Sequence, residues 1–240
     1  MGNDNAAARS FENCKAVITG GSSGIGWEIT QQLREKNAVT TIVDINAPPQ
    51  AYSGLFFRVD LQKPKKLDAV YDSIIEKMGT PNILVLNAGK GIHEKLTEGD
   101  PDLWEDIFRL NLFSNMRLIR AFSPDMLEQE TGDIVFISSV SARKAFEYGG
   151  IYGASKAAVD MIAETLRLEV QPTLRVTTIH PGVVNTSFFE NMIHGSQTPE
   201  SIGWGSVQPK QVADAVMYAL SQPADIALND IVIRPAGQPL

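Results

Sequence analysis

The chain has 240 residues, of which 43% are hydrophobic and 20% charged, and its 21 Lys and Arg against 28 Asp and Glu give a net charge of −7. That composition is typical of a folded globular protein and excludes a disordered chain, and the negative charge argues against nucleic acid as a partner. Cys14 is the only cysteine, so we expect neither an internal disulfide nor a multi-thiolate metal site. No apolar run of 18 residues and no signal-type apolar leader is present, so we expect a cytoplasmic protein without a membrane anchor.

Short apolar segments alternate with helical patterns along the chain, after a leader over residues 1–12 that we expect to be flexible. In chain order the pattern predicts a strand at 15–19, a helix at 24–36, strands at 39–44 and 55–59, a helix at 64–78, a strand at 82–86, a helix at 102–127, a strand at 133–138, a helix at 151–170, a strand at 175–179, a helix at 211–220 and a strand at 231–234. This alternation predicts an α/β fold, a doubly wound parallel sheet of seven strands, in a single domain over residues 13–240.

A long irregular stretch, residues 182–208, interrupts the alternation. Loops longer than about 15 residues in a compact domain are usually functional covers or binding segments. Apolar side chains suited to covering a ligand occur here at Phe188, Phe189, Met192, Ile193 and Trp204. We therefore predict a substrate lid at about residues 186–208.

Three glycines stand where the first strand meets the first helix. Gly20 suits the tight turn, Gly24 lets backbone approach a pyrophosphate, and Gly26 lets the helix sit close on the sheet. The helix then offers free N–H groups and its positive dipole end to the phosphates. Asp44 ends the next strand, where a carboxylate can hold ribose hydroxyls. A purely steric turn and a loop-capping Asp44 are the alternatives, and the combination favours a dinucleotide site.

The spacing Gly-x-x-x-Gly-x-Gly resembles the short-chain dehydrogenase/reductase family of the classical type. Further motifs of that family occur nearly from end to end at Asn87-Ala88-Gly89, Asn111, Ser139, Tyr152-Gly153-Ala154-Ser155-Lys156 and Pro181-Gly182. The resemblance implies a Rossmann-type sheet. The cofactor-binding residues that it implies, together with the glycine turn, are Gly20, Ser22, Ser23, Gly24, Ile25, Gly26, Asp44, Asp60, Asn87, Ala88, Gly89, Tyr152, Lys156, Pro181, Gly182, Val183 and Thr186.

By the same resemblance Asp60 lies near the adenine, Asn87 near the adenosine side of the cofactor, and Val183 and Thr186 near the nicotinamide carboxamide. Each has a plainer alternative. Asp60 caps the following helix, Asn87 ties two strands together, and Thr186 only begins the lid.

Tyr152 and Lys156 are four residues apart on a predicted helix and share a face. A tyrosine with its ordinary pKa of roughly 10 is a poor base, and a neighbouring ammonium is expected to lower that pKa. Tyr152 then exchanges a proton with a substrate oxygen, as base in alcohol oxidation and as acid in ketone reduction. The resemblance adds a second role for Lys156, which is to hold the nicotinamide ribose. Taken alone, such a pair is usually no more than two surface neighbours.

Ser139 ends the fifth predicted strand, at the carboxyl edge of the sheet, where its hydroxyl can hold the substrate oxygen. Ser138 is the competing candidate, and the family's spacing to the tyrosine favours Ser139. The family uses an asparagine at the position of Asn111 to hold a water linked to the lysine. The catalytic set is thus Asn111, Ser139, Tyr152 and Lys156, and no metal is proposed because His93 and His194 lack neighbours at metal-ligand spacing.

These residues predict an oxidoreductase that transfers a hydride between NAD and a secondary alcohol or ketone. NAD is preferred to NADP in this prediction because Asp44 would repel the added phosphate of NADP and Ile45 and Asn46 supply no cation. The alternatives are a dinucleotide-sensing regulator without turnover and an NADPH-dependent 3-oxoacyl-carrier-protein-type reductase. Basic residues in nearby loops, Lys90 and Lys144 among them, leave open an anionic group on the substrate.

Surplus apolar positions on two predicted helices indicate self-association. The segment 103–118 and the helix that carries Tyr152 have more apolar residues than one sheet-facing stripe requires. The family likewise pairs these helices across a two-fold axis. We therefore expect a homodimer or homotetramer, and the chain's carboxyl end, which lacks the family's Asp-Gly-Gly close, does not decide between them.

Overall fold

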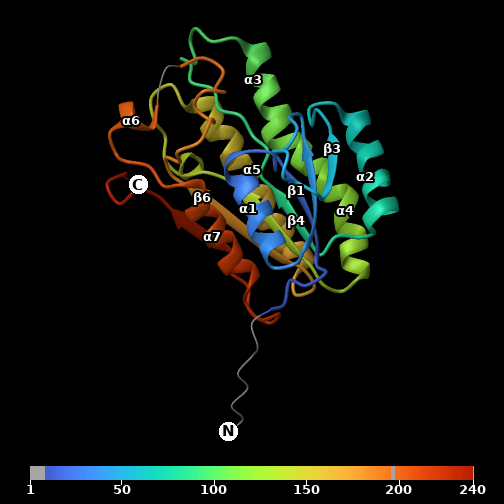
Figure 1. Ribbon diagram of the computed structural model, residues 1–240. Helices are drawn as coiled ribbons and strands as arrows, with labels where there is room; N and C mark the ends of the chain where they lie inside the picture. Colours follow the sequence, from blue (N-terminus) through green and yellow to red (C-terminus); the bar gives the residue numbers. More distant parts are fainter. Residues whose placement is uncertain (1–8, 196–197, 240) are drawn as a thin grey trace.

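The computed structural model describes residues 9–195 and 198–239, which form a seven-stranded parallel sheet with helices on both faces (Figure 1). The strand order is β3-β2-β1-β4-β5-β6-β7. The strands are β1 Lys15–Thr19, β2 Val39–Asp44, β3 Leu55–Arg58, β4 Ile83–Leu86, β5 Asp133–Ile137, β6 Arg175–Pro181 and β7 Asp230–Ile233. The predicted doubly wound α/β sheet is confirmed.

Helices cover the sheet in two layers because side chains of one strand point alternately to its two faces. The helices are α1 Gly24–Glu35, α2 Pro64–Met78, α3 Pro101–Phe108, α4 Ser114–Glu128, α5 Gly150–Val170, α6 Pro199–Ile202 and α7 Pro209–Leu220. Val17 of β1 packs into a core shared with α2, α4 and α5, whereas its neighbour Ile18 packs into a second core shared with α1 and α7. Helices α1 and α7 lie side by side on their face (Figure 1).

The strand order reverses between β1 and β4, and such a reversal leaves a crevice at the carboxyl ends of the strands, where ligands bind in open α/β sheets. Thr19 fixes the two strand ends beside this crevice. Its hydroxyl donates to the carbonyl oxygen of Val85 at 3.2 Å and accepts from the N–H groups of Asn87 and Ala88 at 3.0 and 3.1 Å. The buried Thr19 side chain therefore helps to hold the ends of β1 and β4 together beside the crevice.

The helix predicted at 102–127 is wrong in one respect, because it is interrupted in its middle. A π-helical turn, Arg109–Phe113, separates α3 from α4. A π turn adds a residue to the helix without ending it, and such turns occur often at functional sites. The predicted irregular stretch likewise contains the short helix α6, whose first turn is closed by a capping box between Thr198 and Ser201.

Only the end of the predicted leader, from residue 9, lies within the described residues. Phe11 is buried in the core of α1 and α7, and the guanidinium of Arg9 pairs with the carboxylate of Asp133. The other oxygen of Asp133 accepts from Nε of Arg175 at 2.7 Å. Within the part of the chain that the structure describes, no helix is both long and apolar enough to cross a bilayer.

Candidate active site

The glycine turn after β1 has a backbone that other residues would not adopt. Gly20 and Gly24 have φ angles of +62° and +53°, in the left-handed region that favours glycine. A Cβ on Gly26 would stand 2.2 Å from the carbonyl oxygen of Gly20 and 2.5 Å from Nδ2 of Asn87. Ser23, the N-cap of α1, makes no side-chain capping bond. The turn therefore presents the first N–H groups of α1 to an anion.

Asp44 is held at the mouth of this turn with its carboxylate nearly buried. Its two oxygens accept from the N–H groups of Ser22 and Asn46, both at 3.0 Å, and only 8% of the residue is exposed. The hydroxyl of Ser22 donates to the carbonyl oxygen of Asn46 at 2.7 Å. Ser22 thus contributes to the site by holding the Asp44 carboxylate in place. Each carboxylate oxygen retains a lone pair with which to accept from a ribose hydroxyl.

Of two predicted cofactor residues, Asn87 makes the contact of its plainer alternative, whereas Asp60 does not cap the following helix, whose N-cap is Lys63. Nδ2 of Asn87 donates to the carbonyl oxygens of Thr19 and Gly20 at 3.0 Å each, so it ties β4 to the end of β1. Oδ1 of Asp60 accepts from the N–H of Gln62 at 3.0 Å in the turn before α2. Both residues nevertheless line the pocket described next, so the structural contact and a cofactor contact are compatible.

One pocket of about 840 Å³ joins the glycine turn to the predicted catalytic residues Ser139, Tyr152 and Lys156. That volume lies in the range usual for small-molecule and cofactor sites. Of the predicted site residues, those on its wall are Gly20, Ser23, Gly24, Ile25, Asp44, Asp60, Asn87, Ala88, Gly89, Ser139, Tyr152, Lys156, Pro181, Gly182, Val183 and Thr186. Ser22, Gly26 and Asn111 lie behind this wall. The glycine turn, the buried carboxylate and the volume all fit a dinucleotide.

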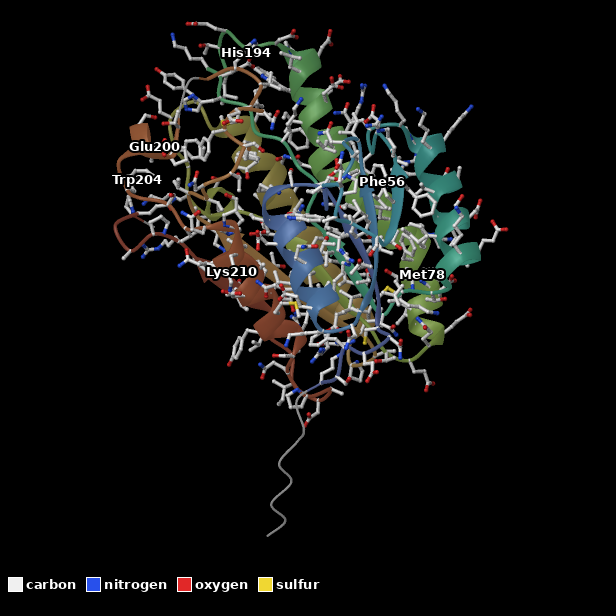
Figure 2. The ribbon with its side chains drawn as sticks, in the orientation of Figure 1. Phe56, Met78, His194, Glu200, Trp204 and Lys210 are labelled. Atoms are coloured by element: carbon white, nitrogen blue, oxygen red, sulfur yellow. The ribbon has the colours of Figure 1, made fainter. Side chains whose placement is uncertain are left out.

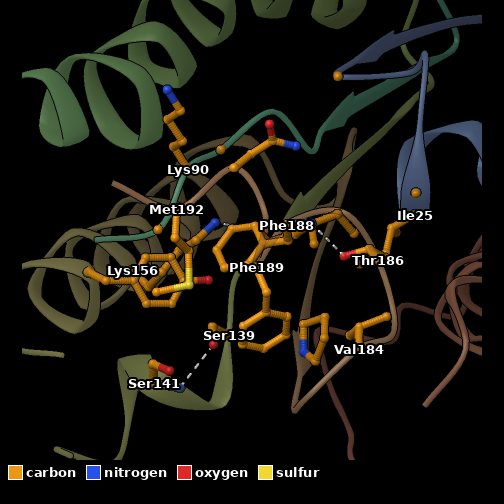
Figure 3. Close-up of a pocket in the computed structure, with 18 of the residues that line it drawn as sticks. Ile25, Lys90, Ser139, Ser141, Lys156, Val184, Thr186, Phe188, Phe189 and Met192 are labelled. Carbon is orange, nitrogen blue, oxygen red and sulfur yellow. Dashed lines mark hydrogen bonds between the residues drawn. The ribbon is translucent and has the colours of Figure 1, made fainter. Parts of the chain in front are cut away.

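Ser139 and Tyr152 meet at the far end of the pocket. The Ser139 hydroxyl accepts from the N–H of Ser141 at 3.1 Å, as the N-cap of the 3₁₀ turn Val140–Ala142 (Figure 3). The competing Ser138 instead donates to the carboxylate of Asp160. This geometry favours Ser139 for a substrate contact.

The expectation that the pKa of Tyr152 is lowered is wrong for this structure. Burial raises the pKa of Tyr152 to about 12, and a hydrogen bond with the Ser139 hydroxyl lowers it only in part. The Lys156 ammonium lies 5.9 Å from the centroid of the tyrosine ring and donates instead to the carbonyl oxygen of Ile137 at 2.8 Å. The Ser139 hydroxyl, and not the Lys156 ammonium, is thus the group that lowers the pKa of Tyr152.

Asn111 lies in the π-helical turn and is fully buried. Its side chain accepts from the N–H of Lys90 at 2.9 Å and donates to the carbonyl oxygen of Lys90 and to the hydroxyl of Ser155, both at 3.0 Å. Ser155 in turn donates to the carbonyl oxygen of Tyr152 at 2.8 Å. Asn111 therefore ties the loop after β4 to the helix that carries the catalytic pair, a contact that the motif spacing did not reveal.

The predicted lid lines the pocket and is attached to the loop after β4. A Cβ on Gly91 would come within 2.9 Å of Phe188 and Met192, so these two side chains rest on the bare glycine backbone. The Phe188 ring lies 5.6 Å from that of Tyr152, and Figure 3 shows Phe188, Phe189 and Met192 among the side chains that line the pocket. An isolated bridge pairs Ile193 with the same loop, and Trp204 lies at the outer edge of the molecule (Figure 2). Movement of the lid stays a prediction.

Sequence reasoning missed Gln238, close to the carboxyl end. Its side-chain oxygen accepts from the N–H of Val183 at 2.9 Å, and the residue is 93% buried against the bare backbone of Gly182. The C-terminal segment therefore holds the loop after β6 that lines the pocket. No local motif signals this contact, because it joins residues 55 positions apart.

The lysine, arginine and histidine side chains of the loops near the pocket take different positions. Lys90 and Lys144 line the pocket, whereas Arg143 pairs with Asp230 and His194 pairs with Glu94. Among residues 9–195 and 198–239, no group of three His, Cys, Asp or Glu side chains is arranged to hold a metal ion.

Comparison with known proteins identifies relatives of the whole chain. The family model described as short chain dehydrogenase matches residues 15–197. An uncharacterized oxidoreductase of Staphylococcus epidermidis is 30% identical over 233 residues, which cover 92% of this chain and 96% of the relative. The match therefore extends over nearly the full length of both proteins.

Solved structures share the fold. A serine dehydrogenase complexed with NADP⁺ has a TM-score of 0.86 and 24% identity, covering 94% of this chain and 96% of that chain. A 3-ketoacyl-(acyl-carrier-protein) reductase of Brucella melitensis complexed with NADH has a TM-score of 0.85 and 23% identity, covering 95% and 99%. At such identities the likeness speaks for the fold alone.

Replacing Gly26 with alanine is expected to weaken dinucleotide binding at least about fivefold. The new methyl group cannot fit 2.2 Å from the Gly20 oxygen, so the turn must move, and overpacking of this kind costs about 1–3 kcal/mol. Binding of NAD and NADP to the purified variants by calorimetry measures the effect. Gly237→Ala is the control, since its methyl would stand at an ordinary 3.4 Å from the Trp204 carbonyl oxygen. Unchanged affinity in a folded Gly26→Ala protein would contradict this role for the turn.

Proposed function

This chain belongs to the short-chain dehydrogenase family, and we propose that it is a NAD-dependent oxidoreductase acting on a secondary alcohol or the matching ketone. The observation that carries the proposal is one pocket with the glycine turn and Asp44 at one end and Ser139, Tyr152 and Lys156 at the other. NAD, when bound, supplies the carbon that accepts or gives the hydride. The protein's task is to place the substrate oxygen and to move one proton.

Each catalytic side chain has a defined part in this proposal. The Ser139 hydroxyl holds the substrate oxygen, and the Tyr152 hydroxyl gives it a proton in ketone reduction or removes one in alcohol oxidation. With its pKa raised to about 12, Tyr152 is protonated at neutral pH, which is the form that reduction uses. Lys156 orients the nicotinamide ribose with its ammonium.

The substrate end of the pocket favours apolar substrates. Phe146, Phe188, Phe189, Met192 and Trp204 line it, and aromatic and thioether side chains bind apolar groups well. A test panel should therefore be weighted towards ketones and alcohols with hydrophobic substituents.

Tyr152→Phe is expected to lower kcat by at least about 100-fold, the scale of positioned acid–base catalysis, while NAD binding is retained. The measurement is kcat and KM for the best substrate of a panel of ketones and alcohols, run in both directions with both cofactors. Tyr218→Phe is the matched control, because Tyr218 is an exposed residue of α7.

Three outcomes of the panel decide the function. Turnover that depends on Tyr152 supports the proposal. Tight NAD binding without turnover on any substrate would favour a dinucleotide-sensing regulator. Turnover confined to NADPH and acyl thioester ketones would favour an acyl-carrier reductase, the activity named for the structurally similar Brucella melitensis protein.

The preference for NAD over NADP rests on Asp44. NADP brings a phosphate to the ribose oxygen that Asp44 would accept from, and the pocket residues beside it, Ile45 and Asn46, carry no positive charge. The fixed position of the Asp44 carboxylate, held by Ser22 and Asn46, strengthens this argument because the charge cannot swing away without losing both bonds. Loss of a hydrogen bond to a charged group costs roughly 1.5–3 kcal/mol before repulsion is counted.

We therefore expect kcat/KM to favour NAD by more than tenfold, and Asp44→Ala to narrow that gap. The ratio of the two cofactors in one preparation is its own control, since partial unfolding lowers both rates alike. Equal use of NAD and NADP by the unmodified protein, or an unchanged ratio in the variant, would remove Asp44 as the selector.

We also propose a homodimer or homotetramer. Phe113 and Met116 at the start of α4 and Met161 and Leu168 on α5 are between 42% and 68% exposed, which leaves apolar surface for self-association. Leu166, on the same helix α5, instead packs into the core. Light scattering at micromolar concentration should give at least twice the chain's 26.2 kDa, and a monomer would refute the proposal. A cytoplasmic location stays a prediction.

A further inference from the structure

Four side chains from four segments, an arginine, two aspartates and a histidine, close into a ring behind α5, the helix that carries Tyr152 and Lys156. Arg143 follows the turn that begins at Ser139, Asp160 lies on α5, His180 on β6 and Asp230 on β7. Oδ2 of Asp160 lies 2.9 Å from Nε2 of His180, and Oδ1 of Asp230 lies 3.2 Å from Nδ1. Arg143 pairs with Asp230 and lies 3.9 Å from Asp160, which completes the ring.

The ring has a buried half and an exposed half. The His180 side chain is 1% exposed and that of Asp160 23%, against 43% for Arg143 and 48% for Asp230. The contact of His180 with Asp230 is within ion-pair distance but lacks hydrogen-bond geometry, so the firm contact of the histidine is with Asp160. Water screens the exposed half, and the electrostatic effect of the ring is therefore concentrated at Asp160.

Asp160 stands next to Lys156 with both oxygens held. It follows Lys156 by four residues on α5, so the two side chains share a face. Oδ1 accepts from the hydroxyl of Ser138, and Oδ2 contacts His180. The carboxylate thus cannot turn to solvent without losing both partners, and its charge stays near Lys156.

The buried Lys156 ammonium needs a nearby negative charge to stay protonated. Lys156 is 5% exposed, and its ammonium is held by a neutral acceptor, the carbonyl oxygen of Ile137. Burial lowers the pKa of Lys156 to about 8, and the charge of Asp160 raises it. An ammonium so close to losing its proton is sensitive to the loss of one neighbouring charge.

We propose that Asp160, held by Ser138 and His180, is a positioning residue that keeps the Lys156 ammonium charged in the buried site. The proposal rests on the proposed function in giving Lys156 a catalytic part. Nearby charged and titratable groups do not replace Asp160. Tyr152 is neutral at working pH, and Figure 3 shows Lys90 directed away from Lys156. One turn beyond Asp160, Glu164 and Arg167 pair with each other.

The test measures the proton on Lys156 directly. Lysine labelled with ¹³C at Cε reports its titration by NMR in the full-length protein, with no substrate needed. The midpoint for Lys156 should lie near pH 8 and should fall by about one pH unit in Asp160→Asn, the low end of the effect of a nearby opposite charge. Asp230→Asn removes the same charge from the exposed half of the ring and should leave the midpoint within about 0.3 pH unit, since water screens that site.

Activity gives a second readout. Loss of the negative charge disfavours the ammonium, so the pH above which kcat/KM for ketone reduction declines should move down with the NMR midpoint in Asp160→Asn. If Asp160 had only a structural role, Asp160→Asn would lower the rate without changing the pH above which kcat/KM declines. Ser138→Ala, which frees one oxygen of Asp160, should lower the titration midpoint of Lys156 by a smaller amount. This variant provides the test if Asp160→Asn does not fold.

An unchanged Lys156 midpoint in folded Asp160→Asn, or an equal fall in Asp230→Asn, would overturn the proposal. If Asp160→Asn does not fold, an unchanged midpoint in Ser138→Ala overturns it. A protein that shows the expected titrations but turns over no alcohol or ketone would refute the proposed function and leave the charge coupling intact.

Discussion

The side-chain amide of Asn87 donates to two carbonyl oxygens at the end of β1, and the geometry of the whole pocket depends on that contact. It holds β4 against β1 at the place where the strand order reverses. The turn at Gly20 and the close approach of Gly26 are both built around the same amide, which leaves no room for a Cβ at either position. Two residues further on, Gly89 leaves the space in which Asn111 and Lys156 approach each other. The segment from Asn87 to Gly89 therefore contributes to the geometry of both ends of the pocket.

The order of strands and helices could be predicted because its signals are local. Each strand is an apolar run and each helix has an apolar stripe, so only the boundaries of the elements differ by a few residues. The π-helical turn at Asn111 could not be predicted in this way. A shift of one residue in an apolar pattern does not by itself identify a π turn, and this turn is stabilised by contacts with Lys90 and Ser155 that only the folded chain brings together. The same limit applies to Gln238 and to the four segments of the charged ring.

The sequence predicted which side chains share one pocket better than it predicted their electrostatics. Motif spacing grouped Ser139, Tyr152 and Lys156, which line the same pocket, but it assumed that a lysine four residues away must act on the tyrosine. The structure directs the ammonium to the Ile137 carbonyl oxygen instead, and burial then works on both groups in the direction that removes their charge. A buried phenol resists becoming a phenolate, which favours the protonated form that reduction would use. A buried ammonium resists staying protonated, so Lys156 is the group that needs a charged partner.

The two ends of the pocket are built from different parts of the chain. They therefore differ in how freely their residues can be exchanged. Backbone at the carboxyl edge of the sheet forms the end that fits a dinucleotide, where small shifts in Gly20 or Gly26 are not tolerated. Side chains of a long loop form the other end, with Phe188 and Met192 resting on Gly91. Loop side chains can be exchanged without disturbing the sheet. Structures 23–24% identical therefore share the fold closely, while the groups that would select a substrate are free to differ. For this chain, the apolar wall between residues 186 and 208 is accordingly a better guide to substrate than any overall likeness.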